Sequence, residues 1–499
     1  MRRLSEISLS ELAPSVRRPN YDWRRLQVGM AHIGVGAFHR CHQAEFTDDA
    51  LEARFGDWGV VGINLRAPRL ADLIAGQDHL YTRTLRDGER VETRVIGSIR
   101  RSLDVEDAAS AEAAIVELAS PSIQVVTMTV TEKGYGLVPA TGALDRDNPL
   151  VKADLAGATP RTLLGLLARA LDRRRAKNAP GVTLISCDNV PSNGALLRPA
   201  LLAFAGEGSA PLARWIEQRV AFPSTMVDRI VPATTADDIG RIGSEIGVVD
   251  EAAVVGEPFR QWVIEDHFAG DRPPWDLARV QFVRDAKPYE TIKMRALNGA
   301  QSTLSHLGAI VGHEFSFEAA RDPLLLSLTR RMLESETAST LPVVDGMAVQ
   351  PYIESSLARI KNSAIRHRCH QIGTDGSQKI RQRILDPLRE RLAAGLSADL
   401  LTLAAGSWIA YCLCGAARFG RRWAPSDPWA APIIALGEQA GEDFAGLAKS
   451  ILAISAIFGT DLATAKMTAS IAAHLRGLLA GDAREYLAGL LARDESRER

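Results

Sequence analysis

The first half of the chain alternates short apolar runs with stretches of helical periodicity. The apolar runs are rich in β-branched residues and occupy Gln27–Val35, Gly59–Leu65, Ile123–Thr131 and Val182–Ser186. Near-continuous apolar runs are typical of strands that are buried on both faces of a parallel sheet. The clearest helix starts at Thr159-Pro160, an N-cap followed by proline, and extends toward Arg174. The alternation predicts an α/β fold with an N-terminal, doubly wound Rossmann-type domain.

The character of the sequence changes near residue 290, where Ala, Leu and Arg become dominant and strand signals fade. Helical periodicity is found in Ala296–Val311, Pro323–Glu334, Ala398–Leu413, Phe444–Ile457 and Leu462–Leu479. This pattern predicts a second, mostly α-helical C-terminal domain. The proline-containing stretch 272–288 is the expected boundary. We therefore expect a dinucleotide-binding domain over residues 1–285 and a helical substrate domain over 286–499.

Composition and charge narrow the class of protein. The 499 residues are 46% hydrophobic and 24% charged, with a formal net charge of −1, so no basic field favours nucleic acid. The most apolar stretch, Leu400–Gly415, is shorter than the roughly 20 residues that a membrane span needs, which predicts a buried helix. The N-terminus has no long apolar core, and the five cysteines are scattered. These features favour a cytoplasmic protein without disulfides.

Two groups of residues raise the question of a metal. Cys412 and Cys414 are separated by a single residue, a poor spacing for zinc. His367 and His370 flank Cys369, but no carboxylate or second histidine cluster stands near them in the sequence. The sequence therefore predicts no metal.

A glycine pair follows the first apolar run and points to a dinucleotide. Gly34 and Gly36 match the first two glycines of a G-x-G-x-x-G turn, where the first permits a tight bend and the second lets the backbone approach a pyrophosphate. The third position is His39, so the match is incomplete. A simple turn between a strand and a helix is the competing interpretation.

The residues after the second strand leave the choice of dinucleotide open. The acidic residue that usually binds the ribose 2′-hydroxyl is missing after Leu65, and the nearest acid is Asp72. Arg66 and Arg69 stand there instead and are suited either to a 2′-phosphate or to a solvated surface. The choice between NAD and NADP therefore stays open from this segment.

One segment at the start of the helical half has the residue types that hydride-transfer chemistry needs. At about 100° per residue, Lys293, Asn298 and Gln301 fall within an arc of roughly 140° on a helix. A buried lysine with a lowered pKa can remove or return the carbinol proton. Amides such as Asn298, and Asn189 after a buried strand, can stabilise a developing alkoxide. Without further context, a surface lysine is the favoured interpretation of Lys293, and the neighbouring proline and glycine favour a turn former at Asn189.

Six segments in order resemble the mannitol dehydrogenase family, the polyol-specific long-chain dehydrogenases. They cover nearly the whole chain: Gly34–Arg40, Thr131–Tyr135, Cys187–Gly194, Phe222–Ile230, Lys293-x4-Asn298 and Asp375–Lys379. The resemblance implies a metal-independent, NAD-dependent secondary-alcohol dehydrogenase with a Rossmann-type domain and a helical domain.

The resemblance also implies roles for individual residues. Lys293 is expected to be the general acid/base, with Glu290 on its proton path and with Asn189 and Asn298 stabilising the oxyanion. The residues expected beside the cofactor are Gly34, Gly36, Phe38, Arg66, Glu132, Val227 and Asp228. Those expected at the substrate are Gln301, Arg368, Gln371 and Lys379.

Within the family, the segment 367–379 is most similar to the fructuronate reductases, also called mannonate oxidoreductases. Their substrates carry a carboxylate, with which Arg368 and Lys379 are suited to pair. Ion pairs between helices are the alternative for both side chains. The expected reaction interconverts D-mannonate and D-fructuronate.

One position departs from the family pattern, Lys-x4-Asn-x2-His. Its last residue is Gln301 here, which can donate a hydrogen bond but cannot titrate. His306, five residues later, is expected on another face. Three hypotheses therefore stay open: a fructuronate reductase, a dehydrogenase of neutral polyols such as mannitol or arabinitol, and a catalytically silent relative that binds a cofactor or sugar. A small sugar acid or polyol is the expected partner of a monomer or weak homo-oligomer.

Overall fold

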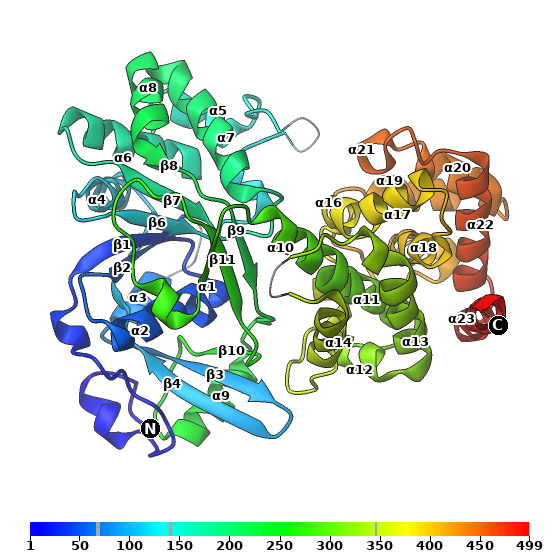
Figure 1. Ribbon diagram of the computed structural model, residues 1–499, viewed down its shortest axis with the longest axis horizontal. Helices are drawn as coiled ribbons and strands as arrows, with labels where there is room; N and C mark the ends of the chain where they lie inside the picture. The colour runs from blue at the N-terminus through cyan, green and yellow to red at the C-terminus, as the bar shows by residue number, and fades with distance from the viewer. Residues whose placement is uncertain (66–69, 139–141, 345–346, 499) are drawn as a thin grey trace. The chain divides into compact units, whose positions relative to one another are not determined.

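The structure is a computed structural model that describes residues 1–65, 70–138, 142–344 and 347–498, with all side chains except those of 132, 133 and 494–498. The chain divides into two compact units, Met1–Lys287 and Pro288–Arg499. They run from blue to green and from green to red in Figure 1.

The described part of the first unit is built on a parallel sheet with the strand order β5-β2-β1-β6-β7-β8. Its strands are β1 (Val28–Ile33), β2 (Gly59–Asn64), β5 (Ile99–Asp104), β6 (Val125–Met128), β7 (Val182–Ser186) and β8 (Val220–Ala221). Counted along the chain within this sheet, the order is 3-2-1-4-5-6, the order of dinucleotide-binding folds. The prediction of an α/β, Rossmann-type first domain is confirmed.

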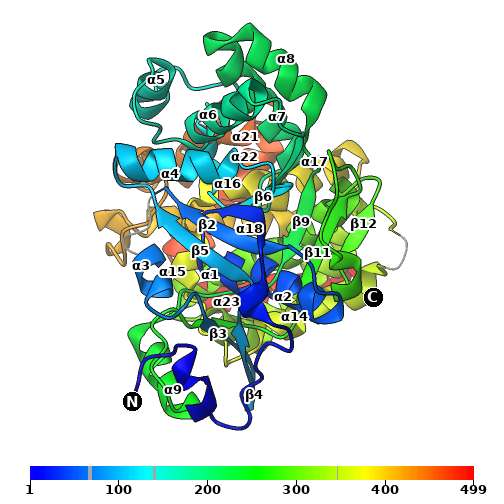
Figure 2. The same ribbon diagram turned by 90° about the vertical axis from the view of Figure 1, so that its left-hand side faces the viewer.

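Helices cover both faces of this sheet. One face buries apolar side chains of α4 (Ala108–Leu118), α6 (Leu163–Ala176) and α7 (Asn193–Gly208). The other face packs against α1 (Ala37–Cys41) and α2 (Gln43–Ala53). Figure 2 shows the two sets of helices on opposite sides of the strands. The remaining helices of the unit are α3 (Leu70–Ala75), α5 (Pro149–Leu155), α8 (Ala210–Arg219) and α9 (Ala236–Ile246).

Two smaller sheets complete the first unit over the described residues. One has the order β10-β3-β4, with β3 (Tyr81–Asp87), β4 (Arg90–Ile96) and β10 (Val254–Gly256). The other has the order β12-β11-β9, with β9 (Thr225–Asp228), β11 (Gln261–Glu265) and β12 (Gln281–Val283).

The predicted start of helix α6 at Thr159-Pro160 is wrong. The helix begins at Leu163, and its N-cap is Thr162, whose Oγ1 accepts from Gly165 N at 3.0 Å. The carboxylate of Asp154 accepts from the backbone N–H groups of Arg161 and Thr162. These bonds keep Arg161 and Thr162 in a loop before the helix. Their backbone N–H groups are bonded to a side chain, which stabilises a non-helical conformation.

The described residues of the second unit are helical, as predicted. Their α-helical segments are α10 (Lys287–Lys293), α11 (Gly299–Val311), α12 (Ser316–Arg321), α13 (Pro323–Arg331), α14 (Val349–Ile360), α15 (Cys369–Gly373), α16 (Gly376–Ile380), α17 (Asp386–Ala393), α18 (Asp399–Leu413), α19 (Ala430–Gln439), α20 (Phe444–Leu452), α21 (Ser455–Phe458), α22 (Ala465–Leu479) and α23 (Ala483–Glu498). The predicted single helix over Phe444–Ile457 is instead the pair α20 and α21.

Helix α18 is the centre of the second unit. Every residue from Leu400 to Leu413 is buried, and the helix packs against α11, α19 and α22. A helix that is apolar all round is stable only when neighbours surround it, which explains the apolar stretch seen in the sequence. Within the described part of the chain, no helix combines the length and apolarity that a membrane span requires.

Candidate active site

The glycine turn after β1 has the geometry that its residues predict. Gly34 has φ +93°, and a Cβ on it would lie 2.1 Å from the carbonyl oxygen of Thr129. Neighbouring strands fix the turn: Gly34 N donates to Ile63 O at 2.7 Å and Val35 N to Asn64 Oδ1 at 2.8 Å. Only glycine fits at position 34, because a side chain is disfavoured there both by φ and by the backbone of β6.

A cavity of about 260 Å³ opens beside this turn. Its lining includes Gly34 and Gly36 after β1, Asn64 at the end of β2, and Thr129 and Thr131 after β6. In open α/β sheets, ligands bind at the carboxyl ends of the strands, where this cavity lies. Gly36 keeps the entrance open, since the nearest described atom to a Cβ there is Gly34 O at 3.9 Å.

Three other predicted cofactor residues have different outcomes. Phe38 does not line the cavity among the described residues, and its ring stacks on His42 with centroids 4.9 Å apart. Arg66 lies outside the described residues, and so does the side chain of Glu132.

At the end of β2, Asn64 Nδ2 donates to Asp104 Oδ1 at 2.8 Å, which places a carboxylate from β5 beside the end of that strand. Sequence periodicity did not predict β5 as a strand, so it did not predict that the carboxylate of Asp104 lies at the end of β2.

Asp188 joins two of the sequence motifs. Its carboxylate accepts from Val130 N at 3.1 Å, from Thr131 N at 2.9 Å and from the hydroxyl of Tyr135 at 2.8 Å. These bonds hold Thr131 at φ +65°, an uncommon conformation for a β-branched residue. The loop after β6 and the loop after β7 are therefore one hydrogen-bonded structure.

Asn193 connects the same loop to the third motif. Its amide accepts from Thr225 N at 2.9 Å and donates to Thr225 O at 3.1 Å, at the start of β9. That strand ends with Val227 and Asp228, both buried. Asn189 is exposed in the first unit.

A buried ion cluster ties β9 to the helix that follows the glycine turn. Glu45 on α2 accepts from Arg83 Nη2 at 2.8 Å and also pairs with Arg229, the residue after Asp228. All three side chains are at most 5% exposed. Burial by itself raises the pKa of the Glu45 carboxyl. The positive charges of Arg83, Arg229 and Arg260 outweigh burial and hold that pKa well below its usual range.

We expect Glu45→Gln to lower the free energy of unfolding by about 3 kcal/mol, because a neutral amide removes the buried counter-charge that Arg83 and Arg229 share. Urea unfolding at pH 7 measures the change. Since the pKa of Glu45 is lowered, its contribution is present above its ordinary value of 4.5 and is lost as the pH falls below it. A variant as stable as the native chain at pH 7 would contradict this role. Glu92→Gln, which removes the half-exposed partner of Arg83, is the matched control.

The second unit carries the lysine segment on a helix with an irregular turn. Residues Met294–Asn298 form a π-helical turn between α10 and α11. The assumption of 100° per residue is therefore wrong over this stretch. A turn with i→i+5 hydrogen bonds contains more residues than an α-helical turn, so each residue turns through a smaller angle. The angle between Lys293 and Asn298 around the helix axis is therefore smaller than the predicted 140°. Turns of this kind are frequent at functional sites.

The environments of the four predicted residues on this helix differ. Glu290, Lys293 and Asn298 are buried at 8%, 4% and 5% exposure. Gln301 is half-buried. The Asn298 Nδ2 lies 3.3 Å from the sulfur of Met294 one turn earlier. A buried lysine and a buried carboxyl three residues apart on one helix are costly to keep without a function or a partner.

A cluster of basic side chains brings helix α11 together with two segments from later in the chain. Lys379 on α16 and His306 on α11 line a small internal cavity of about 10 Å³, the space of about one water molecule. Arg383 donates to Ser302 Oγ at 3.0 Å from a second π-helical turn, Arg381–Leu385. Burial and the charges of Arg383 and Lys379 lower the pKa of His306 to about 3. Arg383 and His306 were given no role from the sequence, because helical periodicity does not reveal which residues of different helices meet.

The other predicted substrate residues lie at the surface. Arg368 is 62% exposed, pairs with Glu314 and lies over the ring of Phe315. Gln371 on α15 is also exposed. Arg368 therefore makes the ion pair between segments that was the alternative to binding a carboxylate. In the described part of the chain, no group of three or more His, Cys, Asp or Glu side chains is placed to hold a metal ion.

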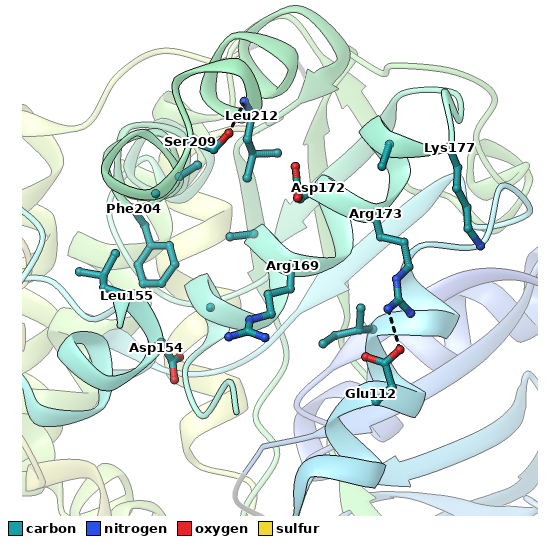
Figure 3. Close-up of a pocket in the computed structure, with 16 residues that line it drawn as sticks. Glu112, Asp154, Leu155, Arg169, Asp172, Arg173, Lys177, Phe204, Ser209 and Leu212 are labelled. Atoms are coloured by element: carbon teal, nitrogen blue, oxygen red, sulfur yellow. Dashed lines mark hydrogen bonds and ion pairs between the residues drawn. The ribbon is translucent and has the colours of Figure 1, made fainter. Parts of the chain in front are cut away.

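A second cavity, of about 560 Å³, lies elsewhere in the first unit (Figure 3). Its lining comes from the helical region α4–α8. Two of its arginines already have partners: Arg173 pairs with Glu112 at 2.6 Å, and Arg169 donates to Gly157 O at 2.7 Å. The cavity beside the glycine turn is therefore the better candidate for a cofactor.

Comparisons with known proteins match nearly the whole chain. Residues 28–277 match the family model described as the mannitol dehydrogenase Rossmann domain, and residues 285–479 match the mannitol dehydrogenase C-terminal domain. The chain is 38% identical over 480 residues to the D-mannonate oxidoreductase of Escherichia coli, covering 95% of this chain and 98% of that protein. It is 40% identical over 481 residues to the uncharacterized oxidoreductase YdfI of the same organism, covering 96% and 98%.

A solved structure shows the same fold. The mannitol 2-dehydrogenase of Pseudomonas fluorescens, in a ternary complex with NAD and D-mannitol, superimposes with a TM-score of 0.90 and 36% identity. The match covers 98% of this chain and 99% of that one.

Proposed function

Because the chain belongs to the mannitol dehydrogenase family of oxidoreductases, we propose that it transfers a hydride between NAD(H) and a sugar-derived secondary alcohol or ketone. The observation that carries this proposal is the glycine turn of the dinucleotide-binding type in the first unit. The second unit supports it separately, since it holds a buried Lys293 beside a π-helical turn. We assign cofactor binding to residues 1–285 and substrate binding to residues 286–499. NADP is not excluded.

A bound nicotinamide dinucleotide would supply the acceptor for the hydride of the carbinol carbon in oxidation, and the hydride donor to the ketone in reduction. Lys293 takes the carbinol proton as the neutral amine during oxidation and returns it as the ammonium during reduction. Asn298 and Asn189 donate hydrogen bonds to the oxygen as charge develops on it. Glu290, one helical turn before Lys293, passes the proton toward solvent.

The cofactor is proposed to lie along the cavity beside Gly34 and Gly36, with Phe38, Val227 and Asp228 near it. The cavity supports this assignment, since its glycines expose backbone where phosphates bind in such folds. Arg66 and Glu132 are further proposed contacts of the cofactor.

For the substrate we propose a hexuronate, with the pair D-mannonate and D-fructuronate as the most specific assignment. Lys379 supports it, because its charge and that of Arg383 both act on His306, which makes this part of the second unit cationic. The Lys379 ammonium also donates to Thr374 O at 2.5 Å. Arg368 is the weaker candidate, since its guanidinium pairs with Glu314. Gln301 and Gln371 would bind hydroxyl groups. The second candidate is a neutral polyol, since the solved relative was bound to D-mannitol.

The test is reduction of fructuronate, tagaturonate, fructose and xylulose, followed by NADH and NADPH absorbance at 340 nm. We expect a uronate to be preferred and Lys379→Met to lower kcat/KM for it by about 10- to 100-fold, the worth of one charge-assisted hydrogen bond. Arg368→Met, which removes a cation that already pairs with Glu314, is the matched control and should change kcat/KM by less than about threefold.

Each alternative has its own outcome. Preference for a neutral ketose would assign the reaction to polyols and give Lys379 a structural role. Dinucleotide binding without turnover of any of the four sugars would favour the catalytically silent relative, for which Gln301 in place of the family histidine is the motivating observation.

A further inference from the structure

Two histidines lie beneath the glycine turn and are stacked on each other. His32 is on β1, two residues before Gly34, and His39 is on α1 at the third position of the glycine fingerprint. Their ring centroids are 3.4 Å apart with an interplanar angle of 16°. They are 0% and 1% exposed. A glycine at position 39 would allow α1 to pack closely on β1. In this chain the stacked rings of His32 and His39 lie between the helix and the strand instead.

His32 is bonded to the turn itself. Its Nε2 lies 3.1 Å from Gly34 O and its Nδ1 lies 2.7 Å from Thr127 Oγ1. Because a carbonyl oxygen only accepts, Nε2 carries the hydrogen and Nδ1 accepts from the threonine. Gly34 O also accepts from Thr129 Oγ1 at 2.7 Å and from Gly36 N at 2.7 Å. The imidazole is thus one of the groups that fix the direction of the Gly34 peptide.

His39 contributes through its ring face. Neither of its ring nitrogens has a hydrogen-bond partner among the described residues. Burial lowers the pKa of His39 well below 6.5 and lowers that of His32 to about 3, so both rings are neutral at physiological pH. Two neutral flat rings stack without repulsion, and His39 thereby holds the plane of His32 against the turn.

We propose that His32 and His39 are positioning residues for the dinucleotide, which act together to hold the Gly34–Gly36 turn open in its cofactor-accepting conformation. The inference rests on the proposed binding of a nicotinamide dinucleotide at this turn. It goes beyond that proposal because neither histidine lines the cavity among its described residues, so both act through the Gly34 carbonyl.

The test compares His32→Leu, which removes the ring's hydrogen bonds to Gly34 O, Thr127 Oγ1 and Thr129 Oγ1, with His32→Gln, whose amide can still donate to Gly34 O. His39→Ala removes the stacked face. The matched control is His474→Leu, since His474 is a buried histidine of the second unit with a hydrogen bond to Tyr486. The measurements are NADH affinity by fluorescence, steady-state kinetics, and amide hydrogen exchange of the segment 33–40 in the cofactor-free protein.

We expect His32→Leu and His39→Ala to raise the Kd and KM for NADH about tenfold, with kcat and the KM for the sugar within about twofold of the native values. Exchange of the segment 33–40 should be faster in both variants, and His32→Gln should recover most of the affinity. An affinity and exchange rate unchanged in His32→Leu would overturn the inference. So would an equal loss in His474→Leu, because it would indicate general destabilisation.

Failure of the proposed function gives a different result. If the native protein bound neither NADH nor NADPH, the proposed activity would be wrong. The exchange measurement would still decide the role of the histidines, because it uses the protein without cofactor.

Discussion

Lys293→Ala is expected to lower kcat by about a thousandfold while leaving the affinity for NADH within about twofold. Positioned general acid/base groups contribute roughly 10²- to 10⁴-fold to rates, and this is the group assigned to the carbinol proton. The lysine is 4% exposed at the junction of α10 and a π-helical turn. Stopped-flow or steady-state reduction of the preferred sugar measures kcat, and NADH fluorescence measures binding.

Two further variants separate proton transfer from charge and from helix stability. Lys293→Arg keeps the positive charge but cannot release a proton near neutral pH, so it should be as slow as the alanine variant. Lys287→Ala alters an exposed lysine at the start of the same helix and should retain native turnover. Turnover near the native rate in Lys293→Ala, or in Lys293→Arg, would contradict the assignment of the general acid/base.

The sheet of the first unit could be predicted because its central strands are buried on both faces. The runs at Val28–Ile33 and Gly59–Asn64 contain almost nothing but buried residues, so their pattern is unmistakable. Strand β5 escaped notice because it is an edge strand with exposed and half-exposed positions and two arginines. Strand β8 is only two residues long. Central strands are set by local composition, whereas edge strands depend on neighbours that a local pattern does not contain.

The candidate site was predictable only in part, for a related reason. Single residues with distinctive chemistry, such as Gly34 and Lys293, stand out in the sequence. The π-helical turn at 294–298 has no periodicity of its own, so the angular relation between Lys293 and Asn298 was misjudged. The pairing of Arg368 with Glu314 joins residues 54 positions apart. Interactions at that separation are fixed by tertiary packing.

Gly34→Ala should destabilise the folded protein by about 4 kcal/mol and abolish measurable dinucleotide binding. An alanine at φ +93° costs about 1–2 kcal/mol, and its Cβ would lie 2.1 Å from Thr129 O, so β6 must move. Gly36→Ala is the matched variant. Its φ of −87° suits any residue, and the described atom nearest to its Cβ is 3.9 Å away. Its free energy of unfolding should therefore change by less than about 0.5 kcal/mol.

Both substitutions should nevertheless weaken the binding of the cofactor. At position 36 the added methyl group would stand where the backbone has to approach the phosphates, so we expect the NADH affinity to fall about a hundredfold without loss of stability. Chemical unfolding together with NADH titration of both variants separates the two mechanisms. Normal NADH binding by Gly36→Ala would mean that the cofactor does not pass along this turn. A large loss of stability in the same variant would mean that other protein atoms pack against Gly36, so that the space beside it is not available to a cofactor.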